Sequence, residues 1–160
     1  MLFRSALGAS GRLAAIGGVC LVVASACGST KSPTPEPTCL AANPDATCTD
    51  PLYPPNFKDL FDNTLLRTCS NGGGPTAGCH SAPYPEAGFE LDDIDTAYAN
   101  ILAKSTTGEP RVIPNDVKCG KVIVRLETAG EPWSMPPDDH LNDQTLCAIT
   151  QWIKSGAPGP

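Results

Sequence analysis

The stretch Asn56-FKDLFDNTLLRT-Cys69-SNGGGPTAG-Cys79-His80 decides the fold. Its first half predicts an amphipathic helix because large apolar residues recur at helical spacing. These residues are Phe57, Leu60, Phe61, Leu65 and Leu66. Pro54 and Pro55 precede the pattern, and Asn56 can accept the first free backbone N–H groups as an N-cap. A glycine-rich segment of nine residues then separates the two cysteines.

Three more stretches carry the same periodicity: Ile94 to Lys104, Asp116 to Glu127, and Asn142 or Asp143 to Ser155. In the 116–127 stretch, Cys119, Val122, Ile123 and Leu126 share a helical face, although its Val-Ile-Val run also fits a short strand. No segment alternates with a period of two for long enough to build a sheet. We therefore expect a small all-α domain of about four helices, joined by long loops and stabilised by disulfides.

The composition indicates an exported protein that does not bind nucleic acid. The 160 residues are 41% hydrophobic and 18% charged, with a net charge of −6. An acidic chain has no excess of cations to replace the counterions along phosphates. Eight cysteines are many for a cytosolic domain and suggest disulfides formed in an oxidising compartment.

Residues 1–26 predict an export signal, since Arg4 and Arg12 are their only charges and an apolar run follows. The run ends in Ala24-Ser25-Ala26-Cys27, which resembles the lipobox of bacterial lipoproteins. Ala24 departs from the usual leucine of that motif, and ordinary secretory cleavage is the alternative. Lipidation of Cys27 would anchor the chain to a membrane, because two or more acyl chains suffice for stable attachment.

Cleavage before Cys27 removes two basic and no acidic residues, which moves the net charge from −6 to −8. Residues 27–38 then form the lipidated cysteine and a Pro-rich tether, 39–55 a disulfide-closed loop, and 56–160 the helical domain. Gly28 gives no cue for inner-membrane retention. We expect the outer membrane, facing the periplasm or the cell surface.

The Cys79-His80 pair at the end of an amphipathic helix is typical of c-type haem attachment. There, two thiols form thioethers to the haem and the adjacent imidazole binds the iron. A thioether sulfur can be the sixth ligand, and Met135 in the Pro-rich run Met135-Pro136-Pro137 can supply it. His140 is the reserve ligand.

With these elements, residues 56–157 resemble the small c-type cytochromes, especially the cytochrome-like modules of bacterial exported lipoproteins. Further matching pieces are the run 88–92 (GFELD) and the ending 152–157 (WIKSGA). The resemblance implies that the first and last helices cross and pack. It also implies haem c as cofactor and an electron carrier rather than an enzyme. The charge of −8 after cleavage would steer such a carrier toward a redox partner with a basic surface.

The spacer of nine residues is a departure, because the family places two residues between its cysteines. Two readings stay open. Cys69 and Cys79 carry haem, or they form a disulfide in a haem-free cytochrome-like lipoprotein with a structural or binding role. A noncovalent haem or another metal at His80 is a third, smaller possibility.

The remaining cysteines are expected to be structural. Proximity and helical phase suggest the pairs Cys39–Cys48 and Cys119–Cys147, out of fifteen ways to pair six cysteines. No nucleophile elbow, phosphate loop or two-histidine metalloprotease helix occurs in the sequence, so no enzyme class is favoured.

Replacing the proposed lipidated cysteine tests the anchor. A Cys27→Ser chain should move from the membrane fraction to the soluble fraction, because it has no sulfur to acylate. Fractionation followed by immunoblotting measures this. A Cys27→Ser chain that stays in the membrane fraction would refute lipidation at this residue.

Overall fold

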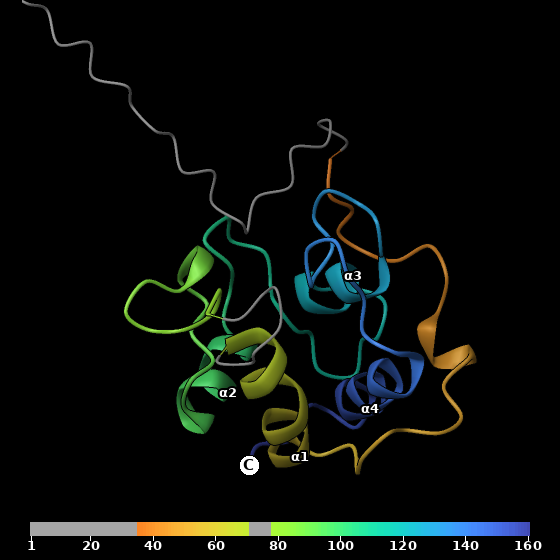
Figure 1. Cartoon of the computed structure of the whole chain (residues 1–160). Helices are drawn as coiled ribbons and strands as arrows, with labels where there is room; N and C mark the ends of the chain where they lie inside the picture. The colour runs from red at the N-terminus through yellow and green to blue at the C-terminus, as the bar shows by residue number, and fades with distance from the viewer. Residues whose placement is uncertain (1–34, 71–77) are drawn as a thin grey trace, which may run out of the picture.

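The computed structural model describes residues 35–70 and 78–160, and it confirms a small all-α domain with long loops (Figure 1). Its elements are η1 (Pro44–Ala46), α1 (Phe57–Leu60), η2 (Phe61–Ser70), η3 (Glu86–Gly88), α2 (Ile94–Leu102), α3 (Lys121–Glu127) and α4 (Asp143–Lys154). Within the described ranges, only isolated bridges and no β-strands occur. The predicted export signal, Cys27 and most of the tether lie outside the described residues, as does the 71–77 part of the spacer.

Three helices begin where an Asn or Asp side chain caps them. Asn56 accepts a hydrogen bond from the Asp59 N–H, Asp93 from the Thr96 N–H, and Asn142 from the Thr145 N–H. Each cap satisfies a backbone donor that the first helical turn leaves free. The predicted starts at Asn56 and Asn142 are therefore confirmed.

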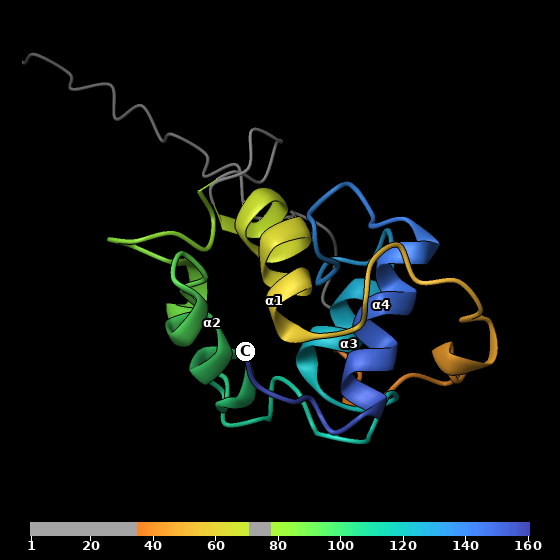
Figure 2. The same cartoon turned by 90° about the horizontal axis from the view of Figure 1, so that it is seen from below.

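The first and last helices cross through their largest side chains, as the resemblance implied (Figure 2). The Phe57 and Trp152 rings lie 5.4 Å apart, and the Tyr98 ring from α2 meets Phe57 edge-on at 4.9 Å. Phe57 and Trp152 are fully buried. The Trp152 indole N–H donates to the Pro158 carbonyl at 2.9 Å, so this polar group is paired within the core. The crossing joins α1, α2 and α4 into one core.

The helix α1 continues into the π-helix η2, which ends at Ser70. A π-helix bonds each N–H to the carbonyl five residues earlier and often accompanies functional sites. Ser70 is fully buried and its hydroxyl donates to the Asp92 carboxylate. The end of η2, which carries Cys69, is therefore held in place.

The third helix is shorter than predicted. The Asp116 carboxylate accepts hydrogen bonds from the Lys118 and Cys119 N–H groups, which makes a turn in place of a first helical turn. Gly120 follows with φ of +108°, and a Cβ there would lie 2.9 Å from the Arg111 carbonyl oxygen. The helix α3 therefore starts at Lys121, and Cys119 lies outside it.

The predicted disulfide pairs are wrong. Cys39 bonds to Cys119 and Cys48 to Cys147. Each bridge joins the segment before the domain to a residue far along the chain, so 39–55 is attached to the helical domain and is not a separately closed loop. The Leu40 N–H also donates to the Lys118 carbonyl at 2.7 Å, which extends the first attachment along the backbone.

None of the helices formed by the described residues is long and apolar enough to cross a membrane.

Removing one of these bridges should destabilise the domain. A Cys48→Ala/Cys147→Ala chain should lose about 2–5 kcal/mol in its free energy of unfolding, because the bridge closes a long loop. Urea unfolding followed by circular dichroism measures the loss. The neighbouring exposed Thr49→Ala is the control and should change stability by less than about 0.5 kcal/mol. Peptide mapping that finds a Cys39–Cys48 bridge would contradict the structure.

Candidate functional site

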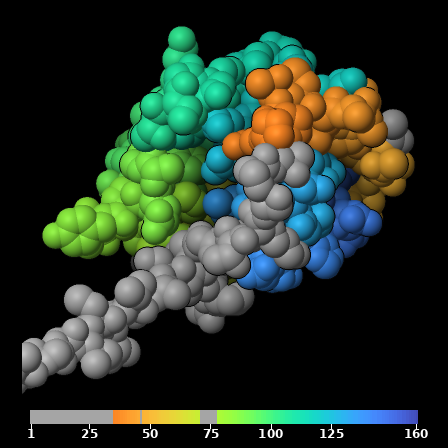
Figure 3. All heavy atoms as spheres, turned by 90° about the horizontal axis from the view of Figure 1, so that it is seen from above, coloured from red at the N-terminus to blue at the C-terminus, as the bar shows by residue number. Residues whose placement is uncertain are grey.

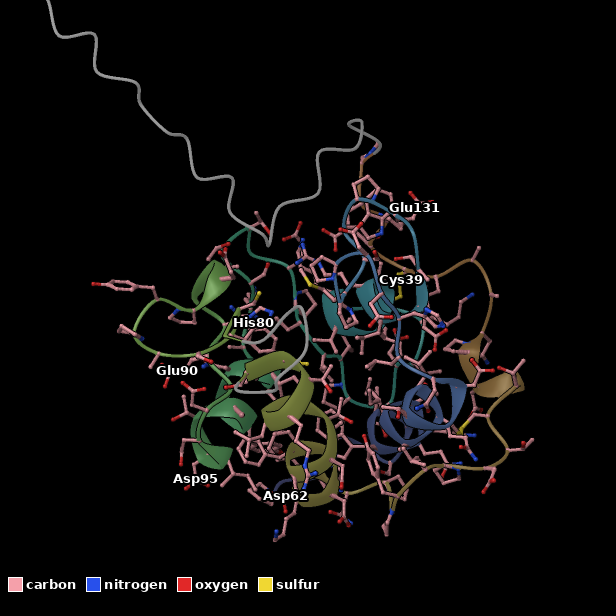
Figure 4. The ribbon with its side chains drawn as sticks, in the orientation of Figure 1. Cys39, Asp62, His80, Glu90, Asp95 and Glu131 are labelled. Atoms are coloured by element: carbon pink, nitrogen blue, oxygen red, sulfur yellow. A yellow bond between two sulfur atoms is a disulfide. The ribbon has the colours of Figure 1, made fainter. Side chains whose placement is uncertain are left out.

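The two ends of the spacer return to each other through the backbone. The His80 N–H donates to the Cys69 carbonyl at 3.2 Å, and the Gly78 N–H donates to the Ser70 carbonyl. His80 therefore lies beside the end of η2 despite the expanded spacing. Figure 4 shows His80 on the inner side of its segment, while Glu90 and Asp95 lie on the outside.

The orientation of the His80 ring is set by the segment that follows it. Its Nδ1 lies 3.0 Å from the Phe89 carbonyl oxygen. A carbonyl only accepts, so Nδ1 is the donor and the neutral ring keeps its lone pair on Nε2. The Phe89 ring meets the imidazole edge-on at 5.1 Å. Burial lowers the pKa of His80 and so favours the neutral ring, although the backbone hydrogen bonds to Phe89 and Glu86 and the charge of Glu86 act in the opposite direction.

Met135 is held against α3 by its own backbone. Its N–H donates to the Arg125 carbonyl at 2.9 Å, and its peptide bond to Pro136 is cis. The nearby Trp133 indole N–H donates to the Thr128 hydroxyl at 2.9 Å. Met135 is half-buried.

These residues line two adjoining cavities. The smaller one, of about 190 Å³, is lined by Cys69, Cys79, His80 and Met135 together. The larger one, of about 300 Å³, shares Cys69, His80 and Met135 with it. Its wall is mostly apolar and includes Leu65, Phe89, Leu91, Ile101, Val122, Leu126, Leu141 and Ile149. A mostly apolar wall with a few polar groups is typical of a small-molecule site.

The larger cavity also carries positive charge. Arg111, Lys121 and Arg125 line it, against the single carboxylate of Glu36. Arg111 is buried, donates to the Asn100 carbonyl at 2.9 Å, and lies over the Phe89 ring at 4.8 Å. Burial lowers the pKa of Arg111. An interior excess of cations is unusual in a chain whose net charge is −6.

The proposed Cys69–Cys79 disulfide is not formed. Cys69 carries a free thiol. Cys79 is disulfide-bonded, but not to Cys69. The alternative of a haem-free lipoprotein was based on a Cys69–Cys79 disulfide, and that disulfide is absent. Burial raises the pKa of the Cys69 thiol to about 12, so this sulfur is protonated at neutral pH.

The reserve ligand does not reach the cavities. The His140 side chain is 72% exposed, its Nδ1 lies 3.9 Å from Asp139, and it lines neither cavity. Among the described residues, no three His, Cys, Asp or Glu side chains cluster as a metal site would require. The site therefore offers one histidine and one thioether as neutral donors.

The sequence family described as Planctomycete cytochrome C matches residues 77–139. The match supports a cytochrome c-like domain. It spans less than half of the chain, starting two residues before Cys79 and including His80 and Met135. No curated protein and no solved structure matches the chain.

Two features of this domain were missed by the sequence analysis. The burial of Arg111 could not be predicted, because nothing in the sequence distinguishes a buried arginine in a loop from an exposed one. The Lys121 and Arg125 pair did leave a trace, because residues four apart lie on one helical face. Their acidic partner, Glu36, was assigned to the tether.

The partial burial and the raised pKa of Cys69 predict low reactivity. At neutral pH its thiol should react with iodoacetamide far more slowly in the folded chain than in urea, because the thiolate is the nucleophile. Mass spectrometry of the peptide that contains Cys69 measures the rate, with glutathione as the reference thiol. Labelling of the folded chain at the rate of glutathione would contradict the described burial.

Proposed function

We propose that the protein is a haem-binding one-electron carrier, and not an enzyme, anchored as a bacterial lipoprotein at the outer membrane and facing the periplasm or the cell surface. The observation that carries the proposal is the smaller cavity. Met135 lines this cavity together with Cys69, Cys79 and His80, although it lies far along the chain.

His80 and Met135 would hold the iron of a bound haem. His80 offers Nε2, because its Nδ1 is held by the Phe89 carbonyl. Met135 offers a thioether sulfur, which favours reduced iron and raises the potential. Bound haem supplies the chemistry, in which the iron gains one electron from one partner and passes it to another.

The apolar wall fits the remainder of such a group. Leucine, isoleucine and valine side chains exclude water from the larger cavity, and excluding water tunes a haem potential. The cations that line this cavity fit the carboxylates that haem carries.

Attachment differs between the two cysteines. Cys69 has a free thiol that can add across a vinyl group to form a thioether. Cys79 can do so only after a thiol reductant has supplied two electrons and two protons to open its disulfide. Cys39, Cys48, Cys119 and Cys147 bond one another and Cys69 is free, so a mature chain acylated at Cys27 has no cysteine left for the Cys79 disulfide. The proposed lipoprotein therefore requires that this bond be opened.

The acidic exterior fits a partner with a basic surface. Glu90, Asp95 and Asp62 lie on the outside of the molecule in Figure 4. A charge of −8 after cleavage of the signal would steer such a partner toward the domain and would make association fall with salt.

Expression of the full chain in cells that contain haem-attachment machinery tests this function. The purified protein should show a Soret band, and its intact mass after unfolding should report any covalent haem. A protein with neither a Soret band nor added mass would contradict the proposal.

Three variants separate the ligands. His80→Ala should abolish the Soret band or shift it strongly. Met135→Leu, which keeps the side-chain volume, should retain haem with a changed reduced spectrum and a lower potential. His140→Ala is the control and should leave the spectrum unchanged, because that side chain is exposed.

A further inference from the structure

Glu36 is held by two cations of the larger cavity. Its carboxylate accepts from the Arg125 guanidinium at 2.7 and 2.8 Å and from the Lys121 ammonium at 3.1 Å. Only 18% of the Glu36 side chain is exposed. Burial alone would raise the pKa of Glu36, but the two cations outweigh it and lower the pKa.

The geometry is that of a carboxylate site. A guanidinium that donates two parallel hydrogen bonds is the arrangement proteins use to recognise carboxylates. Lys121 and Arg125 lie one turn apart on α3, so both side chains project to the same side. Glu109 lies 3.8 Å from Lys121 but does not line this cavity.

The Glu36 carboxylate that fills this site belongs to a segment whose next residues are attached to the domain. The Cys39–Cys119 disulfide and the bond from the Gly120 N–H to the Thr38 carbonyl fix the chain just after Glu36. Figure 3 shows this N-terminal segment, in orange, against the α3 side of the molecule. So short a connection keeps Glu36 at a high effective concentration beside the pair.

We propose that Lys121 and Arg125 form the binding site for a carboxylate of the cavity's ligand, and that Glu36 occupies this site as a built-in competitor. The ligand class is an apolar, ring-shaped carboxylate, that is, a porphyrin with free propionates. This inference rests on the proposed function, because it concerns the same cavity.

Competition couples the cavity to the tether. A ligand carboxylate that binds Lys121 and Arg125 has to displace Glu36. A chain without the Glu36 carboxylate should therefore bind the ligand more tightly. By reciprocity, loading of the cavity weakens the hold on residues 35–37. Arg111 stays available on the same cavity for a second carboxylate.

Metal-free protoporphyrin IX and its dimethyl ester separate the carboxylate from the iron. Both are titrated into the full chain purified from cells without haem-attachment machinery, and quenching of tryptophan fluorescence gives the dissociation constants. Glu36→Gln should lower the dissociation constant of protoporphyrin IX about tenfold. The apparent dissociation constant is the intrinsic one divided by the fraction of molecules whose site is open, and Glu36 keeps that fraction small. Binding of the dimethyl ester should not change.

Two further variants complete the test. Glu36→Gln/Arg125→Met should lose the gain, because it removes the bidentate donor. Glu131→Gln removes one exposed carboxylate and should leave both affinities unchanged. If Glu36→Gln changes the binding of protoporphyrin IX and of its dimethyl ester equally, or changes neither, Glu36 is not a competitor for the carboxylate site.

The outcomes distinguish this inference from the proposed function. If haem is ligated but Glu36→Gln has no selective effect, competition by Glu36 is refuted and the proposed electron-carrier function is retained. If Glu36→Gln selectively tightens the binding of protoporphyrin IX while His80 does not ligate haem, the electron-carrier function is refuted and the carboxylate site is retained. Failure of every porphyrin to bind overturns both.

Discussion

The hydrogen bond from the His80 N–H to the Cys69 carbonyl is the constraint on which the site depends. It fixes the start of the 80–92 segment against the end of η2, whose own position follows from the buried Phe57–Trp152 crossing. The Leu91 N–H then donates to the His80 carbonyl at 2.9 Å. His80 is thus bonded on both sides of its backbone, and only its ring projects toward the cavities.

The distribution of charge gives the cavity its chemical character. Burying a cation costs free energy unless an anion or hydrogen-bond acceptors surround it. Arg125 and Lys121 are paired with Glu36, whereas Arg111 relies on backbone carbonyls and an aromatic ring. An acidic exterior with a cationic interior separates the two tasks of the proposed carrier, which are recognition of a basic partner and retention of an anionic ligand.

The sequence was informative where structure is local. Apolar spacing and capping side chains predicted α1, α2 and α4, because a helix start depends on residues within three positions, such as Asn56 and Asp59. The all-α class and the crossing of the first and last helices followed from the same patterns and the resemblance.

Pairings between distant residues could not be predicted in this way. Cys39 lies near Cys48 in sequence, yet the return of the chain at 116–120 brings Cys119 to it. That return also shortens α3, since it depends on the Asp116 side chain and on the positive φ of Gly120. Glu36 was missed for the same reason, because its partners are α3 residues far along the chain.

A methyl NMR spectrum of the chain labelled at its methionines, recorded with reduced haem, tests the central claim most directly. The chain has two methionines, Met1 and Met135, so the signal is readily assigned by Met135→Leu. We predict that ring currents of the porphyrin shift the Met135 methyl resonance far upfield, as binding of its sulfur to the iron would require. A Met135 resonance that does not move when haem is added would contradict the account.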